Sequence, residues 1–268
     1  MFYKPVQLIA TGDLTKRYNI CYRNPLRVPV QLVIGKDSIT IRAYIAPHRS
    51  MLVPYRAKDG STDGTGDRKL RNILESMQGP GAPYTFMDAA LDGIRECWGK
   101  EYTLKGVDHP VKVNVEFIRK DDPEAVYGKR QKFFGIKQSG MSSTSFVASS
   151  PWRWGWGFLR TGCPEAAMIN WSLRSPGKIH MNYYSSLNNY MHTVSHEFGH
   201  ILGIGDAYDA HYRCYYEAPG TRDFMMNSNS SVHSQELEMV LRAHMTGKMQ
   251  FFPFKISLKR FFKRVFKK

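Results

Sequence analysis

The stretch His196-Glu197-Phe198-Gly199-His200-Ile201-Leu202-Gly203-Ile204-Gly205-Asp206 decides how this chain is interpreted. Two histidines four residues apart lie on one face of a helix, so both imidazoles can reach a single metal ion. Glu197 leans toward the same pocket, where it can take a proton from a water held by the metal. Gly203 is placed to end the helix in a left-handed conformation, and Asp206 then offers a third ligand from the turn. The stretch predicts a zinc site suited to hydrolysis.

The residues before this stretch favour one helix that carries both histidines. Tyr190 to Ser195 contain no proline or glycine, so a helix of roughly 14 residues can run through them into the stretch. The alternative is a buried helix whose histidines only form hydrogen bonds. That alternative does not explain a glycine and an acid at the observed spacing after the second histidine, and we therefore favour a metal site.

The extended pattern resembles that of the metzincin clan of zinc endopeptidases, His-Glu-x-x-His-x-x-Gly-x-x-His. His196, Glu197, His200 and Gly203 match it, and Asp206 stands in place of the last histidine. A minority of metzincin-like bacterial peptidases, snapalysin among them, carry aspartate there. A carboxylate at this position neutralises more of the zinc charge than an imidazole does.

The second signature of the clan is a methionine turn beneath the metal. The segment 223–228 resembles that turn, with Met225 the better match and Met226 the alternative. It lies downstream of Asp206 and before a helical pattern, as the resemblance requires. In motif detail the resemblance covers only residues 196–228.

Other residues after His200 are alternative third ligands. Glu236 and Glu238 begin a helical pattern from Ser234 to His244, and a thermolysin-like site takes its third ligand from a later helix. Asp206 is preferred because its spacing matches the metzincin turn and so short a connection costs little loop entropy. The remaining alternatives are Asp209, His211 and Glu217.

Two further histidines are interpreted as structural or surface residues. His192 faces a different side of the helix, and His180 belongs to an upstream strand. In the predicted reaction, Tyr208, Tyr212 or another nearby tyrosine is expected to help stabilise the oxyanion. The sequence does not choose between them.

Hydrophobic periodicity outlines a sheet before the metal-binding helix. The first two strands predict a hairpin around Gly35-Lys36-Asp37. The predicted strands are 28–34, 38–45, 111–118, 133–137, 168–173 and 178–184, and the predicted helices outside the motif are 68–77, 83–98 and 234–244. The metzincin resemblance implies an α+β, zincin-like fold with a mixed twisted sheet, an active-site helix and a small C-terminal subdomain. It also implies that 179–184, or the segment just before it, lines a substrate cleft.

Length and composition fit one catalytic domain with a tail. A chain of 268 residues with 42% hydrophobic content can bury a sizeable core. We expect this domain over residues 1–250, with an N-terminal lobe to about residue 203 and a C-terminal lobe over 204–250, followed by a basic amphipathic tail over 251–268. Four cysteines are too few for a disulfide scaffold, although Cys163 and Cys214 can pair in an oxidising compartment.

Residues 150–158 contain three tryptophans, Trp152, Trp154 and Trp156, at a spacing of two. The intervening glycine and this spacing exclude an amphipathic helix. We favour an irregular strand with the tryptophans packed beneath the sheet over a loop that offers aromatic surface to a substrate or a membrane.

Charge is concentrated in the C-terminal tail. The formal net charge is +15, and residues 239–268 contain no acid. The bases there are Arg242, Lys248, Lys255, Lys259, Arg260, Lys263, Arg264, Lys267 and Lys268. On a helix, the bases and phenylalanines of residues 254–268 separate into two stripes. Such a tail can bind an anionic membrane, which is the functional interpretation we prefer, contact nucleic acid, or pack its phenylalanines on the body.

The N-terminus does not resemble a secretion signal. Residues 1–10 lack a sustained apolar core, and no stretch reaches the roughly 18 apolar residues that span a bilayer. We expect a monomer that is secreted or delivered outside the cell by another route or with a removed leader.

The predicted function is that of a zinc-dependent endopeptidase acting on protein or peptide substrates. The alternative is a basic membrane- or nucleic-acid-binding protein with a vestigial zincin fold. Glu197 disfavours the alternative, because a purely structural zinc site has no use for an ionisable base at that position.

Overall fold

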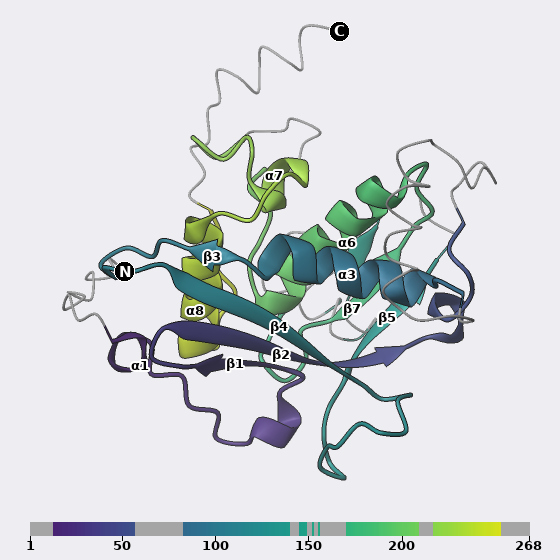
Figure 1. Ribbon diagram of the computed structural model, residues 1–268, viewed down its shortest axis with the longest axis horizontal. Coiled ribbons are helices and arrows are strands. Elements are labelled where there is room, and N and C mark those ends of the chain that lie inside the picture. Colours follow the sequence, from purple (N-terminus) through teal and green to yellow (C-terminus); the bar gives the residue numbers. More distant parts are fainter. Residues whose placement is uncertain are drawn as a thin grey trace, which may run out of the picture.

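The structure is a computed structural model that describes residues 13–56, 83–139, 145–148, 152, 155, 170–208 and 217–252. Within these residues, a twisted mixed sheet of seven strands carries its principal helices on one face (Figure 1). The fold is therefore of the mixed α/β kind.

The sheet is built around β2 (Ser38–Pro47), its longest strand. A tight hairpin joins β2 to the antiparallel strand β1 (Val30–Ile34). β4 (Val111–Arg119) runs parallel to β2 on the opposite edge, and β5 (Phe134–Gln138) runs parallel to its C-terminal end. The remaining strands are β7 (Lys178–Met181), parallel to β5, and the short antiparallel strands β3 (Glu101–Tyr102) and β6 (Phe146–Ala148), in the order β3-β4-β2-β5-β7-β6.

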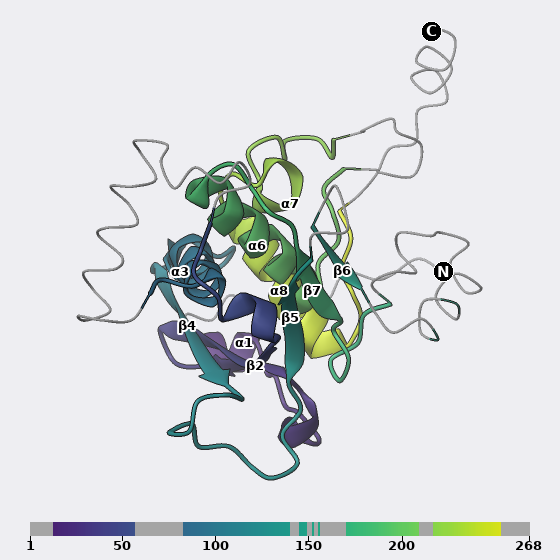
Figure 2. The same cartoon turned by 90° about the vertical axis from the view of Figure 1, so that its right-hand side faces the viewer.

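Alternation of side chains makes one face of this sheet hydrophobic. In β2, Ile39 and Ile41 are fully buried, whereas the residues between them are partly exposed. Helices α3 (Phe86–Trp98) and α6 (Leu187–Leu202) lie side by side over the buried face (Figures 1 and 2). They approach closely at Gly93, where a Cβ atom would stand only 2.6 Å from the Cα atom of Met191.

The ends of α6 follow from two local signals. The Ser186 hydroxyl caps the first turn by accepting a hydrogen bond from the Asn189 N–H at 3.2 Å. Gly203 ends the helix with φ 97°, a left-handed conformation that favours glycine. The Trp171 ring packs directly against Gly203, and its indole N–H donates to the Ile201 carbonyl at 2.9 Å. The turn that leads to Asp206 is therefore fixed by both backbone geometry and packing.

The chain after this turn forms α7 (Met225–Ser228) and α8 (Ser234–Thr246). α8 packs on α6 through the buried residues Leu237, Val240 and Leu241, which belong to the main core. The other short helices of the described chain are α1 (Leu14–Arg17), η1 (Pro25–Arg27) and η2 (Arg49–Met51).

Most of the predicted elements are confirmed. The hairpin, the strands at 111–118 and 133–137, and the helices at 83–98 and 234–244 occur with small shifts at their ends. The predicted strand 178–184 ends early, at Met181, and α6 begins at Leu187, three residues before the predicted start. None of the described helices is long and apolar enough to cross a membrane.

Two predictions are wrong. No strand forms over 170–173, where Ser172 makes only an isolated bridge to Ser175, because the chain turns back on itself there. Of the three tryptophans predicted to pack beneath the sheet, Trp152 is 79% exposed and does not do so; Trp154 and Trp156 lie outside the described residues. The predicted helix 68–77, the pair Cys163 and Cys214, and the tail 254–268 lie outside the described residues.

Candidate metal centre

The sequence-predicted ligands come together at the C-terminal half of α6. His196 and His200 lie one helical turn apart, each only 5% exposed, with ring centroids separated by 5.0 Å. Asp206 reaches them from the turn after Gly203, with its Oδ1 atom 3.0 Å from His196 Nε2 and 3.4 Å from His200 Nε2. One ligand atom from each of the three residues lies within 4.8 Å of the other two. This cluster can hold a metal ion.

Main-chain carbonyls fix the tautomer of both histidines. Nδ1 of His196 lies 2.8 Å from the Met225 carbonyl oxygen, and Nδ1 of His200 lies 2.9 Å from the Ile204 carbonyl oxygen. Because a carbonyl oxygen only accepts, each Nδ1 must carry the proton. In the neutral imidazoles, both Nε2 lone pairs therefore point into the pocket, in the arrangement typical of metal-binding histidines.

The three converging ligand atoms are all acceptors when both imidazoles are neutral, so they can hydrogen-bond to one another only if a histidine is protonated. The Nε2 lone pairs meet Asp206 Oδ1, a buried acceptor that has no hydrogen-bond partner within the described chain. Such an arrangement is unfavourable without a cation between the three atoms. Ligand atoms held about 2.0–2.1 Å from a tetrahedral zinc ion stand about 3.3 Å apart, close to the spacing of Asp206 Oδ1 from the two imidazoles. The spacing of these donors is therefore compatible with a metal ion held by all three residues.

Protons compete with a metal for this pocket. Burial disfavours a charged imidazole at His200, but the Asp206 carboxylate outweighs burial and raises the pKa of His200 to about 9. The pKa of His196 is raised by the same carboxylate against the effect of burial. Burial would raise the pKa of Asp206, yet the two imidazoles hold it well below its ordinary value. Metal binding at neutral pH must therefore displace protons.

Glu197 is a buried carboxyl group with an unused acceptor. It is 4% exposed, and its Oε2 atom has no hydrogen-bond partner in the part of the chain that the structure describes. Desolvation raises its pKa above the ordinary value for glutamate, against the opposing effect of His200 and His196. A buried carboxyl group with a raised pKa beside three candidate metal ligands is typical of a general base.

The turn at α7 contacts the candidate metal site through Met225 and Met226. The Met225 carbonyl accepts the hydrogen bond from His196, and Met225 and Met226 are both fully buried. The Met226 sulfur packs against Gly199, where a Cβ atom would overlap it. Met225 thus contacts the site through its backbone and Met226 through its side chain. The assignment of Met225 as the methionine of the turn stays a prediction.

Glu236 ties this turn to α8. Its side chain is fully buried, and its two oxygens accept hydrogen bonds from the Met226 N–H at 2.8 Å and the His233 N–H at 2.7 Å. A sequence signal for part of this contact exists, because a glutamate at the third position of a helix is typical of a capping box. The bond to Met226 was not foreseeable from the sequence, since it joins residues that only the folded turn brings together.

Further contacts hold the same turn against α6 and against the segment that follows α3. The Lys100 ammonium donates to the Ser231 hydroxyl at 2.8 Å. His192 uses its Nδ1 to bond the Asn229 carbonyl at 2.6 Å, and Asn229 closes α7 in a left-handed conformation. The carbonyl that orients His196 is therefore part of a turn that is fastened on several sides.

The described alternative ligands do not join the cluster. Glu236 is occupied by two backbone N–H groups, and Glu238 accepts from the Lys105 N–H at 2.8 Å. Glu217 is exposed, while Asp209 and His211 lie outside the described residues. His180 stacks on Phe146 in the sheet, at a centroid distance of 4.6 Å, which confirms its interpretation as a residue outside the site.

Of the two tyrosines considered for the oxyanion, only Tyr208 belongs to the described residues. Its ring stacks on His196 with a centroid distance of 6.5 Å and an interplanar angle of 23°. Tyr208 therefore lies beside the cluster, and its role in oxyanion stabilisation stays a prediction.

Comparisons with models of protein families, with curated proteins and with solved structures gave no match to this chain. The interpretation of the site therefore rests on its geometry and chemistry.

The raised pKa of His200 makes the stability of the metal-free protein depend on pH. A histidine whose pKa is 6.5 in the unfolded chain and about 9 in the folded one stabilises the fold below pH 6.5. This contribution is lost as the pH rises from 6.5 to 9. We expect the Tm in the presence of a chelator to fall across that window, as measured by calorimetry. The variant Asp206→Asn removes the carboxylate charge with little change of shape, so its Tm should fall less than that of the wild type over the same pH range. An equal dependence of Tm on pH in the two proteins would contradict this account.

Replacing Glu236 tests the link between α8 and the turn. Glu236→Ala leaves two buried N–H groups unpaired, each at a cost of about 1–3 kcal/mol, and we expect the free energy of unfolding to fall by at least about 2 kcal/mol. Glu236→Gln retains one acceptor oxygen, so its free energy of unfolding should fall less than that of Glu236→Ala. Urea denaturation measures both, and the exposed neighbour Gln235→Ala is the control, with an expected change within about 0.5 kcal/mol. Equal stability of Glu236→Ala and the control would contradict the assigned hydrogen bonds.

Proposed function

We propose that this protein is a zinc-dependent endopeptidase of the metzincin type. The observation that carries the proposal is the convergence of His196, His200 and Asp206 beside the buried, unpaired carboxyl oxygen of Glu197. A mixed sheet covered by the helix that bears these histidines is consistent with a zincin-like architecture. When bound, zinc polarises a peptide carbonyl and lowers the pKa of a water molecule to about 7.

The protein's own groups supply the proton transfers. Glu197 accepts the proton of the attacking water on its free oxygen and delivers it to the amine of the leaving peptide fragment. Burial raises the pKa of Glu197 above its ordinary value, which makes its carboxylate a stronger proton acceptor. The carbonyls of Met225 and Ile204 keep the imidazoles oriented throughout, because they bond the Nδ1 atoms that take no part in the chemistry.

Peptide substrates suit an unpaired strand edge beside the site. We expected segment 179–184, or the one before it, to line the cleft, but β7 is paired on both edges over Lys178–Met181, with β5 and with β6. Among the described residues, β6 ends the sheet on the side of β7, and it also contacts α6. Its outer edge is therefore the one that we propose for pairing with an extended peptide substrate.

A vestigial or purely structural metal site is the competing function. It does not account for Glu197. A buried carboxyl oxygen without a hydrogen-bond partner lowers stability, and a purely structural metal site has no function for it. A structural site would also fill the fourth zinc position with a protein ligand, and the cluster of described residues contains only three.

The proposal is tested by zinc content and proteolysis together. We expect about one zinc ion per chain in the wild type and in Glu197→Gln, because Glu197 is not a ligand. Cleavage of an unstructured protein substrate should fall by about a hundredfold to ten-thousandfold in kcat/KM for Glu197→Gln, because the general base is lost. The matched control is Glu96→Gln, an exposed glutamate of α3, with unchanged activity. Full proteolysis by Glu197→Gln, or a wild type that binds zinc and cleaves no peptide bond, would refute the proposal.

A further inference from the structure

A second surface of this protein combines bases with exposed apolar side chains. It is formed by the loop between β4 and β5 together with η1, and we call it the basic loop surface. Its apolar residues are 91% exposed at Val126 and 38% exposed at both Leu26 and Tyr127. Its bases, all exposed, are Arg23, Arg27, Lys129, Arg130 and Lys132.

Backbone contacts make these two segments one continuous surface. The Lys132 N–H donates to the Leu26 carbonyl at 2.8 Å, and the Gln131 side chain donates to the Val28 carbonyl at 3.3 Å. The Leu26 side chain also rests against Gly128, where a Cβ atom would stand 2.8 Å from it. The bases of η1 and of the loop therefore lie around the same exposed apolar side chains.

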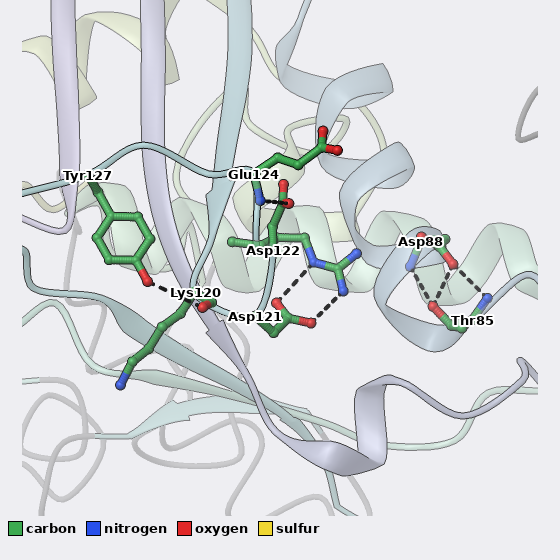
Figure 3. A network of polar contacts seen from close by, with 8 residues as sticks. Thr85, Asp88, Lys120, Asp121, Asp122, Glu124 and Tyr127 are labelled. Carbon is green, nitrogen blue, oxygen red and sulfur yellow. Dashed lines mark hydrogen bonds and ion pairs between the residues drawn. The ribbon is translucent and has the colours of Figure 1, made fainter.

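Contacts of Tyr127 hold the loop in shape. The Tyr127 ring packs edge-on against Phe133 at 4.9 Å, and Phe133 packs in the same way against Tyr44 at 6.0 Å. The Tyr127 hydroxyl donates to the Lys120 carbonyl at 3.4 Å (Figure 3). Val126 is the residue before Tyr127, and its side chain is exposed to solvent. This is an unusual position for an aliphatic side chain in a loop that is otherwise polar.

The bases of this surface outnumber its acids, and the two are separated along the loop. Segments 18–36 and 125–139 contain bases and no aspartate or glutamate. Asp121, on the arm that leads into the loop, is paired with Arg119 at 2.6 Å. The Glu124 side chain extends away from Tyr127 (Figure 3). Asp122 accepts a hydrogen bond from the Glu124 N–H at 2.9 Å. The three acids of the loop thus precede Ala125, whereas Lys129, Arg130 and Lys132 follow Tyr127.

The surface is remote from the metal centre. The β4–β5 loop lies at the end of the molecule opposite α7 in both views (Figures 1 and 2). A partner bound there leaves α7 and the ligands of α6 uncovered. Binding at this surface and catalysis at the metal centre are therefore compatible.

We propose that the basic loop surface docks the protein on an anionic lipid bilayer. The five bases face the lipid phosphates, while Val126, with Leu26 and Tyr127 at its sides, enters the headgroup region. Charge complementarity selects an anionic partner, and the projecting aliphatic side chain selects a bilayer over nucleic acid, whose phosphates offer it no apolar contact. The inference does not depend on the proposed peptidase activity or on the C-terminal tail.

Vesicle co-sedimentation of the full-length protein tests the proposal. We expect binding to vesicles that contain phosphatidylserine and much weaker binding to pure phosphatidylcholine vesicles. The triple variant Lys129→Gln/Arg130→Gln/Lys132→Gln should reduce the partition coefficient by at least about tenfold, since each base near an anionic surface contributes about fivefold. Val126→Ser should cause a several-fold loss with no change in net charge.

A matched control separates this surface from the overall positive charge. Lys105→Gln/Lys112→Gln/Lys248→Gln removes the same charge from exposed positions distant from the loop, and it keeps the tail intact. Its binding should change by less than about twofold, because distant charges are screened. Equal loss in the two triple variants would overturn the proposal. It would also be overturned if the loop variant lost binding to a single-stranded oligonucleotide but kept its binding to vesicles.

Discussion

Two hydrogen bonds, from the Nδ1 atoms of His196 and His200 to main-chain carbonyls, determine the chemistry that this protein can perform. They place the protons on the outer side of each ring and leave both lone pairs directed at the Asp206 carboxylate. Three acceptors that converge in a buried site are stabilised by a cation between them. The pocket is therefore built for a proton or a metal ion, and a raised pKa at both histidines is the consequence when a metal is absent.

The surrounding fold keeps those two carbonyls in place. One belongs to the turn after α6, where Gly203 adopts a left-handed conformation beneath the Trp171 ring. The other belongs to the turn at α7. Glu236 links this turn to α8, and Lys100, between α3 and β3, hydrogen-bonds to Ser231 just after the turn. Each histidine is thus oriented by a different segment of the chain. Pre-organisation of this kind lowers the cost of assembling a metal site.

The local parts of this arrangement were predictable from the sequence. The spacing of His196 and His200 places them on one helical face, and Gly203 and Asp206 follow at intervals that a helix end and a short turn explain. The hairpin of β1 and β2 was likewise evident from its alternation and its turn. These features depend on residues that are close in sequence, where propensity and periodicity are informative.

The long-range parts could not be predicted. Glu236 had the correct chemistry for a metal ligand, and only the folded chain shows that its two oxygens accept hydrogen bonds from backbone N–H groups instead. The pairing of β7 on both edges, and the joining of η1 to the β4–β5 loop, depend on strand order rather than on local sequence. The predicted strand 168–173 contains four apolar residues, but in its described part the chain reverses between Ser172 and Ser175.

X-ray absorption spectroscopy of the zinc-loaded protein measures the first coordination sphere directly. The account predicts nitrogen and oxygen ligands at about 2.0–2.1 Å, with the scattering of two imidazoles in the wild type and of one in His200→Gln. Zinc ligated by sulfur at about 2.3 Å, or a spectrum unchanged in His200→Gln, would contradict it.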